Sequence, residues 1–265
     1  MMGVGGNPRE GLRQVRALGV NTAQMGCPPA KYLAGEGVAE LKKIISESGV
    51  TITTVFCGFD GESYDDIPTV RRTVGLVPRG TREARLAKTR EIIEFAHRIG
   101  VKSVSAHIGF IPEDRSDADY KELVKALRDI CDMCAMNSQN FCLETGQETA
   151  ETLQNFIRDV NRGNLKVNFD PANMILYGSG EPIAALVLLG KYVAGVHCKD
   201  AVWSEQKGVF GHEMPLGKGQ VGIDRFVATL KQIGYTGPLT IEREISGEQQ
   251  TKDILEAIAL LRSLR

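Results

Sequence analysis

The sequence predicts a single α/β domain, a (β/α)₈ or TIM barrel in which eight parallel strands are each followed by a helix. Three observations lead to this prediction. Short apolar runs alternate with longer helical patterns along the chain, glycines follow most helical patterns, and 265 residues suit a barrel that commonly fills about 250. We expect residues 1–265 to form one domain, because no linker or internal repeat interrupts the alternation.

The strand-like runs and helical patterns alternate without a segment left over. Strand-like runs occupy residues 1–4, 20–25, 50–59, 102–110, 140–145, 165–169, 193–197 and 239–245. Helical patterns occupy residues 8–18, 38–48, 81–99, 118–136, 149–160, 182–189, 223–233 and 249–264. The first strand is unusually short. We therefore expect either that it pairs poorly with its neighbours in the barrel or that translation starts upstream of Met1. The connections at residues 60–80 and 201–222 are long and follow strands, as loops of a catalytic face do.

An open, doubly wound sheet is the structural alternative. It would normally carry a glycine-rich turn after its first strand, with an acidic residue at the end of the next strand. Gly3, Gly5 and Gly6 match that turn weakly, and no acidic residue follows at the usual offset. The sequence therefore favours the barrel over a dinucleotide-binding domain.

Composition narrows the function classes. Hydrophobic residues make up 42% of the chain and the net charge is -1, so there is a sizeable core but no basic field to hold nucleic acid. No stretch of about 20 apolar residues is present to span a membrane, and the start has no apolar run typical of a signal peptide. We expect a cytoplasmic protein with reduced cysteines, in which Cys131 and Cys134 pack in the core.

Four ionisable residues stand where predicted apolar strands end. Glu144, Asp170, His197 and Glu242 each follow an apolar run directly, in the fifth to eighth strands. The carboxyl ends of parallel strands meet at one end of a barrel, so we expect these side chains to converge. Three converging carboxylates repel one another unless a cation neutralises them. With one imidazole they form a mostly hard donor set, which suits one divalent Mn, Mg or Co ion, with Zn as a further option.

A purely structural explanation exists for each of these residues. A lone carboxylate at a strand end is usually a helix cap or an ion-pair partner, and a lone histidine there is usually a packing residue. Four such residues at successive strand ends favour a metal site over coincidence.

Several short motifs carry a family resemblance. They surround His107 (Ala-His-Ile-Gly), Glu144 (Leu-Glu-Thr), Asp170 (Asp-Pro-Ala-Asn), His197 (His-Cys-Lys-Asp), Gly217 (Pro-Leu-Gly-Lys-Gly) and Glu242 (Gly-Tyr-Thr-Gly-Pro-Leu-Thr-Ile-Glu). With them the chain resembles the sugar phosphate isomerase/epimerase family. These are xylose isomerase-like barrels that include ketose 3-epimerases, hydroxypyruvate isomerase, inosose dehydratase and the endonuclease IV group.

The resemblance implies that Glu144, Asp170, His197 and Glu242 ligate one metal and that Glu144 and Glu242 transfer protons. The positions agree with this, because the fifth and eighth of eight strands lie nearly opposite each other and could place carboxylates on both faces of a substrate. Abstracting a proton beside a carbonyl needs a base, and the enediolate that forms needs a nearby cation. We therefore expect a metal-dependent isomerase or epimerase of sugars or sugar phosphates, working through an enediolate.

Further residues are candidates for substrate binding. His107 ends the fourth predicted strand, Asn173 follows Asp170 by three positions, Lys199 follows His197 by two, and Trp203 lies in the long loop after them. The structural alternatives are an ion pair between Lys199 and Asp200 and a tryptophan that packs its own loop. Ketose 3-epimerases place a histidine at the position of Asn173 and an arginine shortly after the metal histidine, so these two positions argue against that particular branch. The glycines of the Pro-Leu-Gly-Lys-Gly motif are candidates for backbone contacts with a phosphate.

Three other functions remain open at the level of the sequence. A lyase of the inosose or dehydroshikimate dehydratase kind would use the same metal and base but expel a hydroxyl group. An endonuclease IV-like phosphodiesterase is disfavoured, because it needs many histidines and this chain has only four. A non-catalytic sugar-binding barrel is the third. The expected partner is a small sugar or sugar phosphate, and a homo-oligomer is an open option.

Overall fold

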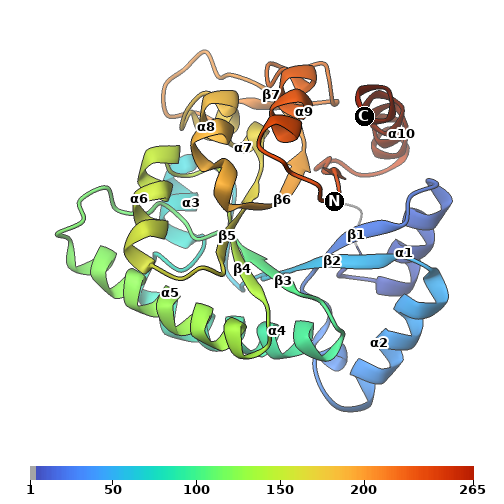
Figure 1. Cartoon of the computed structure of the whole chain (residues 1–265), viewed down its shortest axis with the longest axis horizontal. Coiled ribbons are helices and arrows are strands. Elements are labelled where there is room, and N and C mark those ends of the chain that lie inside the picture. Colours follow the sequence, from blue (N-terminus) through green and yellow to red (C-terminus); the bar gives the residue numbers. More distant parts are fainter. Residues whose placement is uncertain (1–3) are drawn as a thin grey trace.

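A ring of parallel strands surrounded by helices forms the molecule (Figure 1). The computed structural model describes residues 4–265. Within them, seven strands form one sheet in the order of the chain, each parallel to the next: β1 Thr22–Gly26, β2 Thr51–Phe56, β3 Ser103–Ala106, β4 Asn140–Glu144, β5 Leu165–Phe169, β6 Val193–Cys198 and β9 Thr240–Ile241. This confirms the barrel prediction and seven of its strands.

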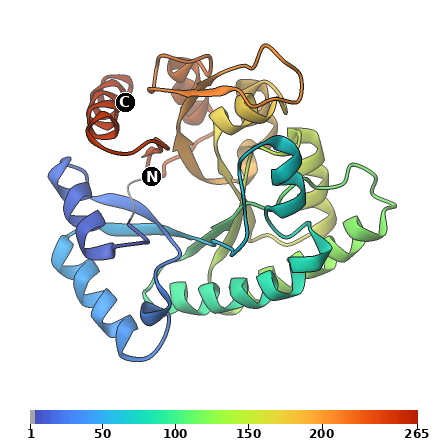
Figure 2. The ribbon, with the colours of Figure 1, turned by 180° about the vertical axis from the view of Figure 1, so that it is seen from behind.

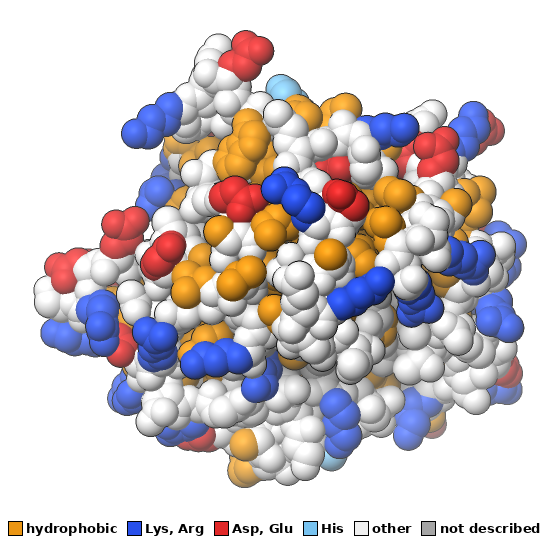
Figure 3. All heavy atoms as spheres, turned by 45° about the horizontal axis from the view of Figure 1, so that its top comes forward, with side chains coloured by type: hydrophobic (Ala, Val, Ile, Leu, Met, Phe, Trp, Pro, Cys, Tyr) orange, Lys and Arg blue, Asp and Glu red, His pale blue; other side chains and the backbone are white. Residues whose placement is uncertain are grey.

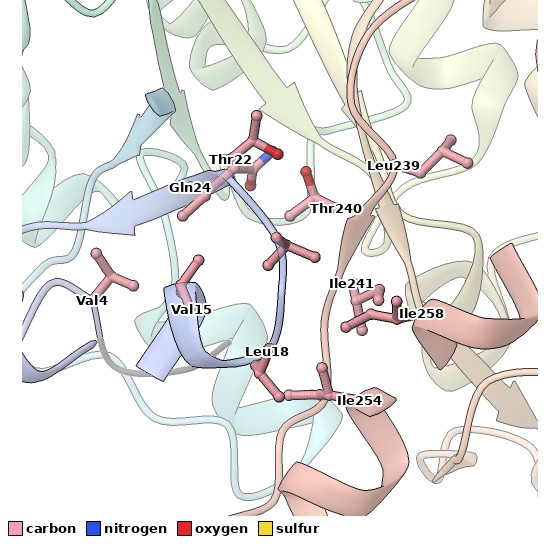
Figure 4. Close-up of a pocket in the computed structure, with 12 residues that line it drawn as sticks. Val4, Val15, Leu18, Thr22, Gln24, Leu239, Thr240, Ile241, Ile254 and Ile258 are labelled. Atoms are coloured by element: carbon pink, nitrogen blue, oxygen red, sulfur yellow. The ribbon is translucent and has the colours of Figure 1, made fainter. Parts of the chain in front are cut away.

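The remaining predicted strand, the first one at residues 1–4, lies mostly outside the described residues. Its one described residue, Val4, is in a turn. Among residues 4–265, β1 pairs only with β2 and β9 pairs only with β6, so the sheet is nearly closed and leaves a seam between β1 and β9. A cavity of about 110 Å³ fills this seam and is lined mainly by apolar side chains (Figure 4).

Ten α-helices connect the strands in the described part of the chain. They are α1 Pro8–Ala17, α2 Gly35–Ser48, α3 Ile67–Thr73, α4 Arg79–Arg98, α5 Ala118–Met136, α6 Ala150–Val160, α7 Pro171–Tyr177, α8 Pro182–Leu189, α9 Ile223–Gln232 and α10 Glu248–Leu264. Single 3-10 turns span Ala30–Tyr32 and Gly190–Tyr192. Helices α4 and α5 lie along one side of the sheet, and α10 lies on another side (Figure 2).

Both long connections contain secondary structure of their own. The connection after β2 contains the short helix α3, which begins at the side-chain cap of Asp66. The connection after β6 contains an antiparallel hairpin made of β7, Asp200–Val202, and β8, His212–Met214. The long loops therefore carry structure of their own at the carboxyl end of the barrel.

The core lies between the strands and the surrounding helices. Phe95, Phe141, Phe156, Phe169 and Phe226 are among the largest side chains that it buries fully. Cys131 and Cys134 on α5 are also fully buried as free thiols, which confirms their prediction as core residues. Within residues 4–265, no helix combines the length and the apolar character needed to cross a bilayer. One face of the surface shows positive and negative side chains interspersed (Figure 3).

Candidate metal centre

The four residues at the predicted strand ends meet inside the barrel. Glu144 is the last residue of β4, Asp170 follows β5, His197 lies near the end of β6, and Glu242 follows β9. Each offers one ligand atom, and these atoms all lie within 4.8 Å of one another. Their exposed fractions are 2%, 0%, 1% and 8%, respectively. The predicted convergence is therefore present, in a setting that removes all four side chains from bulk water.

His197 lies at the centre of the cluster. Its Nδ1 is 2.8 Å from Oε1 of Glu144, 3.1 Å from Oε2 of Glu242 and 3.3 Å from Oδ2 of Asp170. In an octahedral site with metal bonds of about 2.1 Å, neighbouring ligand atoms lie about 3 Å apart. The spacing and the hard donor set both fit one divalent cation.

Gln24 on β1 contacts the other nitrogen of the same ring. The Oε1 atom of Gln24 lies 2.7 Å from Nε2 of His197, and the aromatic ring of Phe56 stacks on the imidazole with centroids 5.5 Å apart. Sequence reasoning missed Gln24. Its only signal was one polar residue between Ala23 and Met25, in an apolar strand of the barrel.

Asp170 divides its two carboxylate oxygens between two tasks. Oδ1 accepts the backbone N–H groups of Ala172 and Asn173 at 2.8 and 3.0 Å, and so caps helix α7. Oδ2 faces His197. The structural role as a helix cap and a role as a metal ligand are therefore compatible in this residue.

The charges of the cluster depend on one another. Burial alone would lower the pKa of His197, but the carboxylates of Glu242 and Glu144 raise it well above its usual value. Burial would raise the pKa of Glu242, but His197 and Lys199 hold it well below its usual value. The carboxylates thus attract positive charge to this point of the barrel, which a divalent cation also supplies.

Lys199 and Asn173 lie beside the cluster. Lys199 is 2% exposed, and its Nζ is 3.3 Å from Oε2 of Glu242 and 2.7 Å from Oε2 of Glu244. Lys199 donates to Oδ1 of Asn173 at 3.2 Å, while Nδ2 of Asn173 donates to Oε1 of Glu144 at 3.4 Å. Both residues therefore border the cluster, and their contact with a substrate stays a prediction.

Asp200 is not the partner of Lys199 that the structural alternative proposed. Its carboxylate accepts the backbone N–H groups of Ala201, Gly217, Gly219 and Val221 at 2.9 to 3.1 Å. A Cβ atom at Gly219 would lie 2.2 Å from Oδ1 of Asp200, so the close approach requires glycine. Asp200 thus anchors the Pro-Leu-Gly-Lys-Gly loop, and the glycine N–H groups considered for a phosphate are already bonded to it.

The last two predicted residues lie at different depths. His107 follows β3, and its Nε2 is 3.4 Å from Oε2 of Glu144. Its Nδ1 is 3.4 Å from Nε2 of Gln147. Trp203 follows β7 with 38% of its surface exposed, and its backbone N–H donates to Gln220. The structure therefore places His107 beside the cluster and Trp203 on the outer hairpin, where substrate contact stays a prediction.

Contacts of the residues that follow Glu242 hold this part of the chain in place. The next residue, Arg243, reaches Asp253 on α10 through Nε at 2.7 Å and Glu213 on β8 through Nη1 at 3.1 Å. Glu213 also accepts the backbone N–H of Glu244 at 3.0 Å. Side chains from the hairpin and from the last helix therefore hold the segment that carries Glu242.

Solved structures with related folds cover nearly the whole chain. A xylose isomerase domain protein from Planctomyces limnophilus is 46% identical, with a TM-score of 0.91 over 96% of this chain and 91% of that one. D-Psicose 3-epimerase from Clostridium cellulolyticum H10 is 17% identical, with a TM-score of 0.74 over 99% and 95%. The probable 3-DHS dehydratase of Bacillus anthracis is 16% identical, with a TM-score of 0.67 over 95% and 92%. At these low identities the last two establish the shared fold alone.

Sequence comparison gives the family. An uncharacterized protein of Methanocaldococcus jannaschii is 27% identical over 180 residues, which span 63% of this chain and 59% of that protein. The profile of the Xylose isomerase-like TIM barrel family matches residues 12–264, which is nearly the whole sequence. The chain therefore belongs to the Xylose isomerase-like TIM barrel family.

Proposed function

We propose that the protein is a metal-dependent isomerase or epimerase of a sugar or sugar phosphate. The observation that carries this proposal is the buried cluster of Glu144, Asp170, His197 and Glu242 at the carboxyl ends of β4, β5, β6 and β9. The four residues would hold one divalent ion. When bound, that ion would polarise a substrate carbonyl and stabilise the negative charge of an enediolate.

Glu144 and Glu242 are the proposed proton-transfer pair. They come from β4 and β9, with β5 and β6 between them in the sheet. One carboxylate would remove the proton beside the carbonyl, and the other would return a proton to the second face of the same carbon or to the neighbouring oxygen. The ammonium group of Lys199, the amide of Asn173 and the imidazole of His107 would hold substrate hydroxyl groups by hydrogen bonds.

Dehydration is the second candidate on the same residues. A probable 3-DHS dehydratase and a D-psicose 3-epimerase share this barrel fold, so the fold itself is compatible with either reaction. Both begin with removal of a proton beside a carbonyl, but a dehydratase then expels a hydroxyl group. Product mass separates them, because only dehydration loses a water molecule.

Metal analysis tests the proposed centre directly. Protein purified without chelators should carry Mn, Mg, Co or Zn at close to one ion per chain, and His197→Ala should lose it. His97→Ala, which changes an exposed histidine on α4, is the matched control and should keep the metal. If wild-type protein binds no divalent ion even after supplementation, the metal-dependent function is wrong.

Hydrogen exchange tests the proposed base. In D₂O, wild-type enzyme should exchange the carbon-bound hydrogen beside the carbonyl of an accepted ketose or ketose phosphate. Glu144→Gln should slow this exchange by about 100-fold or more, because positioned bases commonly contribute factors of that size. Glu151→Gln on the exposed face of α6 should leave it unchanged. Exchange at the wild-type rate in Glu144→Gln would remove Glu144 from the mechanism.

A further inference from the structure

We propose that Gln24 is a positioning residue that fixes the tautomer of His197, so that Nδ1 and not Nε2 is the nitrogen offered to the metal. The inference rests on the proposed metal site and adds a residue outside the four ligands. Gln24 is on β1, across the seam from β9, and comes from a strand that supplies none of the candidate ligands. Figure 4 shows it among the residues that border the seam.

The hydrogen bonds of Gln24 determine which way its amide points. Nε2 of Gln24 donates to Oδ1 of Asn168 on β5 at 3.0 Å, and this oxygen can only accept. In this orientation Oε1 of Gln24 faces Nε2 of His197, at 2.7 Å. A carbonyl oxygen has no proton to give, so Nε2 of His197 carries the hydrogen. In the neutral ring, Nδ1 is therefore the atom with the free lone pair, and it is the atom that faces the three carboxylates.

Local backbone irregularities bring both amides into this arrangement. The pairing of β1 with β2 shifts register between Ala23 and Gln24, and the pairing of β5 with β6 shifts between Val167 and Asn168. Register shifts of this kind change the direction of the following side chain and recur near active sites. Each of the two amide residues follows such a shift immediately, which indicates that the backbone is adapted to direct them inward.

Gly195 on β6 provides the space for the same network. A Cβ atom there would lie 2.4 Å from Oδ1 of Asn168. Any larger residue would push Asn168 away from Gln24. Gln24 and Asn168 are 4% and 1% exposed, so water cannot readily replace the lost contacts. Residues from β1, β5 and β6 thus combine to hold one imidazole nitrogen.

Hydrogen bonds to the second nitrogen of a metal-binding histidine usually fix its tautomer, and their loss typically weakens metal binding 10- to 100-fold. Gln24→Leu removes the acceptor while filling similar space. Gln24→Glu keeps an acceptor for Nε2–H. Nδ2 of Asn168 has no hydrogen-bond partner in residues 4–265, so its amide can turn to donate to the new carboxylate. Met25→Leu, one residue further along β1 and fully buried, controls for disturbance of the strand.

The experiment measures Mn²⁺ dissociation constants and the tautomer of His197 in each variant. Histidine-selective ¹⁵N NMR of the Mg²⁺-loaded protein reports the tautomer, and the His197→Ala spectrum assigns the signals among the four histidines. We expect a proton on Nε2 in wild type and in Gln24→Glu. We expect a changed Nε2–H signal and Mn²⁺ binding weakened by about 10- to 100-fold in Gln24→Leu. Met25→Leu should resemble wild type in both measurements.

The outcomes separate this inference from the proposed function. If wild type binds Mn²⁺ and Gln24→Leu binds it equally well, or if Nδ1 carries the proton in the loaded protein, Gln24 does not position His197 while the metal site stands. If Gln24→Glu is as weak as Gln24→Leu, a role in packing replaces the inferred one. If wild type binds no divalent ion, the metal site fails, and with it the claim that Gln24 prepares a ligand.

Discussion

The two sides of the candidate metal centre are held in different ways. Glu144, Asp170 and His197 come from β4, β5 and β6, and each of these strands pairs with a neighbour on both sides. Glu242 follows β9, which is two residues long and, among the described residues, pairs only with β6. The other edge of β9 faces the seam cavity. Three ligands are thus positioned by the sheet, while the fourth stands beside a break in it.

Side-chain contacts replace the missing strand pairing around Glu242. Arg243 joins the segment to Asp253 on α10 and to Glu213 on the hairpin, and Glu213 also holds the backbone of Glu244. The side chain of Arg243 is 12% exposed and that of Asp253 is 4% exposed, so these contacts are shielded from water more than surface ion pairs are. Side chains outside the sheet therefore hold the fourth candidate ligand, Glu242, in place where strand pairing is incomplete.

Truncating one core side chain on each side of the metal centre should give the largest difference in the free energy of unfolding. Val167 on β5 is fully buried, and Val167→Ala should lower the free energy of unfolding by about 2–3 kcal/mol, since it opens a cavity in a packed region. Ile241→Ala on β9 removes more carbon atoms but borders an existing cavity and a half-exposed strand. We expect it to cost only about 1 kcal/mol.

Urea unfolding of both variants measures this difference. Equal losses would contradict it and would show that the seam is packed as tightly as the rest of the barrel. Val101→Ala, two residues before β3 and only 4% exposed, provides a second buried valine for calibration.

Removing the contacts that Arg243 makes with Asp253 and Glu213 should weaken metal binding more than it destabilises the fold. Arg243→Gln removes the contacts with Asp253 and Glu213, so Glu242 should lose its fixed position and Mn²⁺ affinity should fall by about 10-fold. Such a loss is at the low end of the range for residues that orient metal ligands. Calorimetric titration with Mn²⁺ measures the change.

Two variants control for this prediction. Arg243→Lys keeps the charge and should recover part of the affinity. Arg115→Gln breaks an exposed ion pair with Asp159 far along the chain and should leave Mn²⁺ binding unchanged. Affinity that is equal in Arg243→Gln and wild type would mean that β9 alone positions Glu242.

The sequence was sufficient where one local pattern determined the outcome. Apolar runs that end in Glu144, Asp170, His197 and Glu242 predicted both the strands and the convergence, because parallel strands deliver their carboxyl ends to one place. It was insufficient where partners come from distant segments. Gln24 lies 173 positions from His197, and nothing local in either segment pairs them.

Lys199 and Asp200 illustrate the same limit over a shorter range. Adjacent opposite charges suggested an ion pair, but successive residues of an extended chain point to opposite sides. Lys199 turns to Glu242 and Glu244, while Asp200 binds the loop of Gly217 and Gly219. Which side chain a residue contacts depends on how the whole barrel folds, and no local sequence pattern predicts it.

The smallest expected effect is a pH dependence of the free energy of unfolding, caused by the buried carboxyl group of Glu148 beside β4. Glu148 follows β4 by four positions and is 7% exposed, and neither carboxylate oxygen has a hydrogen-bond partner in another residue of the described chain. Loss of hydration raises the pKa of Glu148 to about 8. This better-paired side of the barrel therefore holds an acid that is neutral at pH 7, whereas the unfolded chain ionises it near pH 4.5.

The sign of the effect follows from the proton count. Between about pH 4.5 and 8, folded Glu148 binds one proton that the unfolded chain has released, so the free energy of unfolding falls as pH rises. The slope from this group is at most about 1.4 kcal/mol per pH unit, and relaxation around the charge should reduce the total to about 1–2 kcal/mol. Glu148→Gln removes the titration, so its stability relative to wild type should increase from pH 5 to pH 8.

Urea unfolding of Glu148→Gln and wild type at pH 5, 6, 7 and 8 measures this difference, with Glu151→Gln on the exposed surface of α6 as the matched control. A difference that stays constant across the series would show that Glu148 is ionised in the folded protein. In that case a cation or ordered water must reach this loop, and the well-paired side of the barrel would be as open to solvent as the seam.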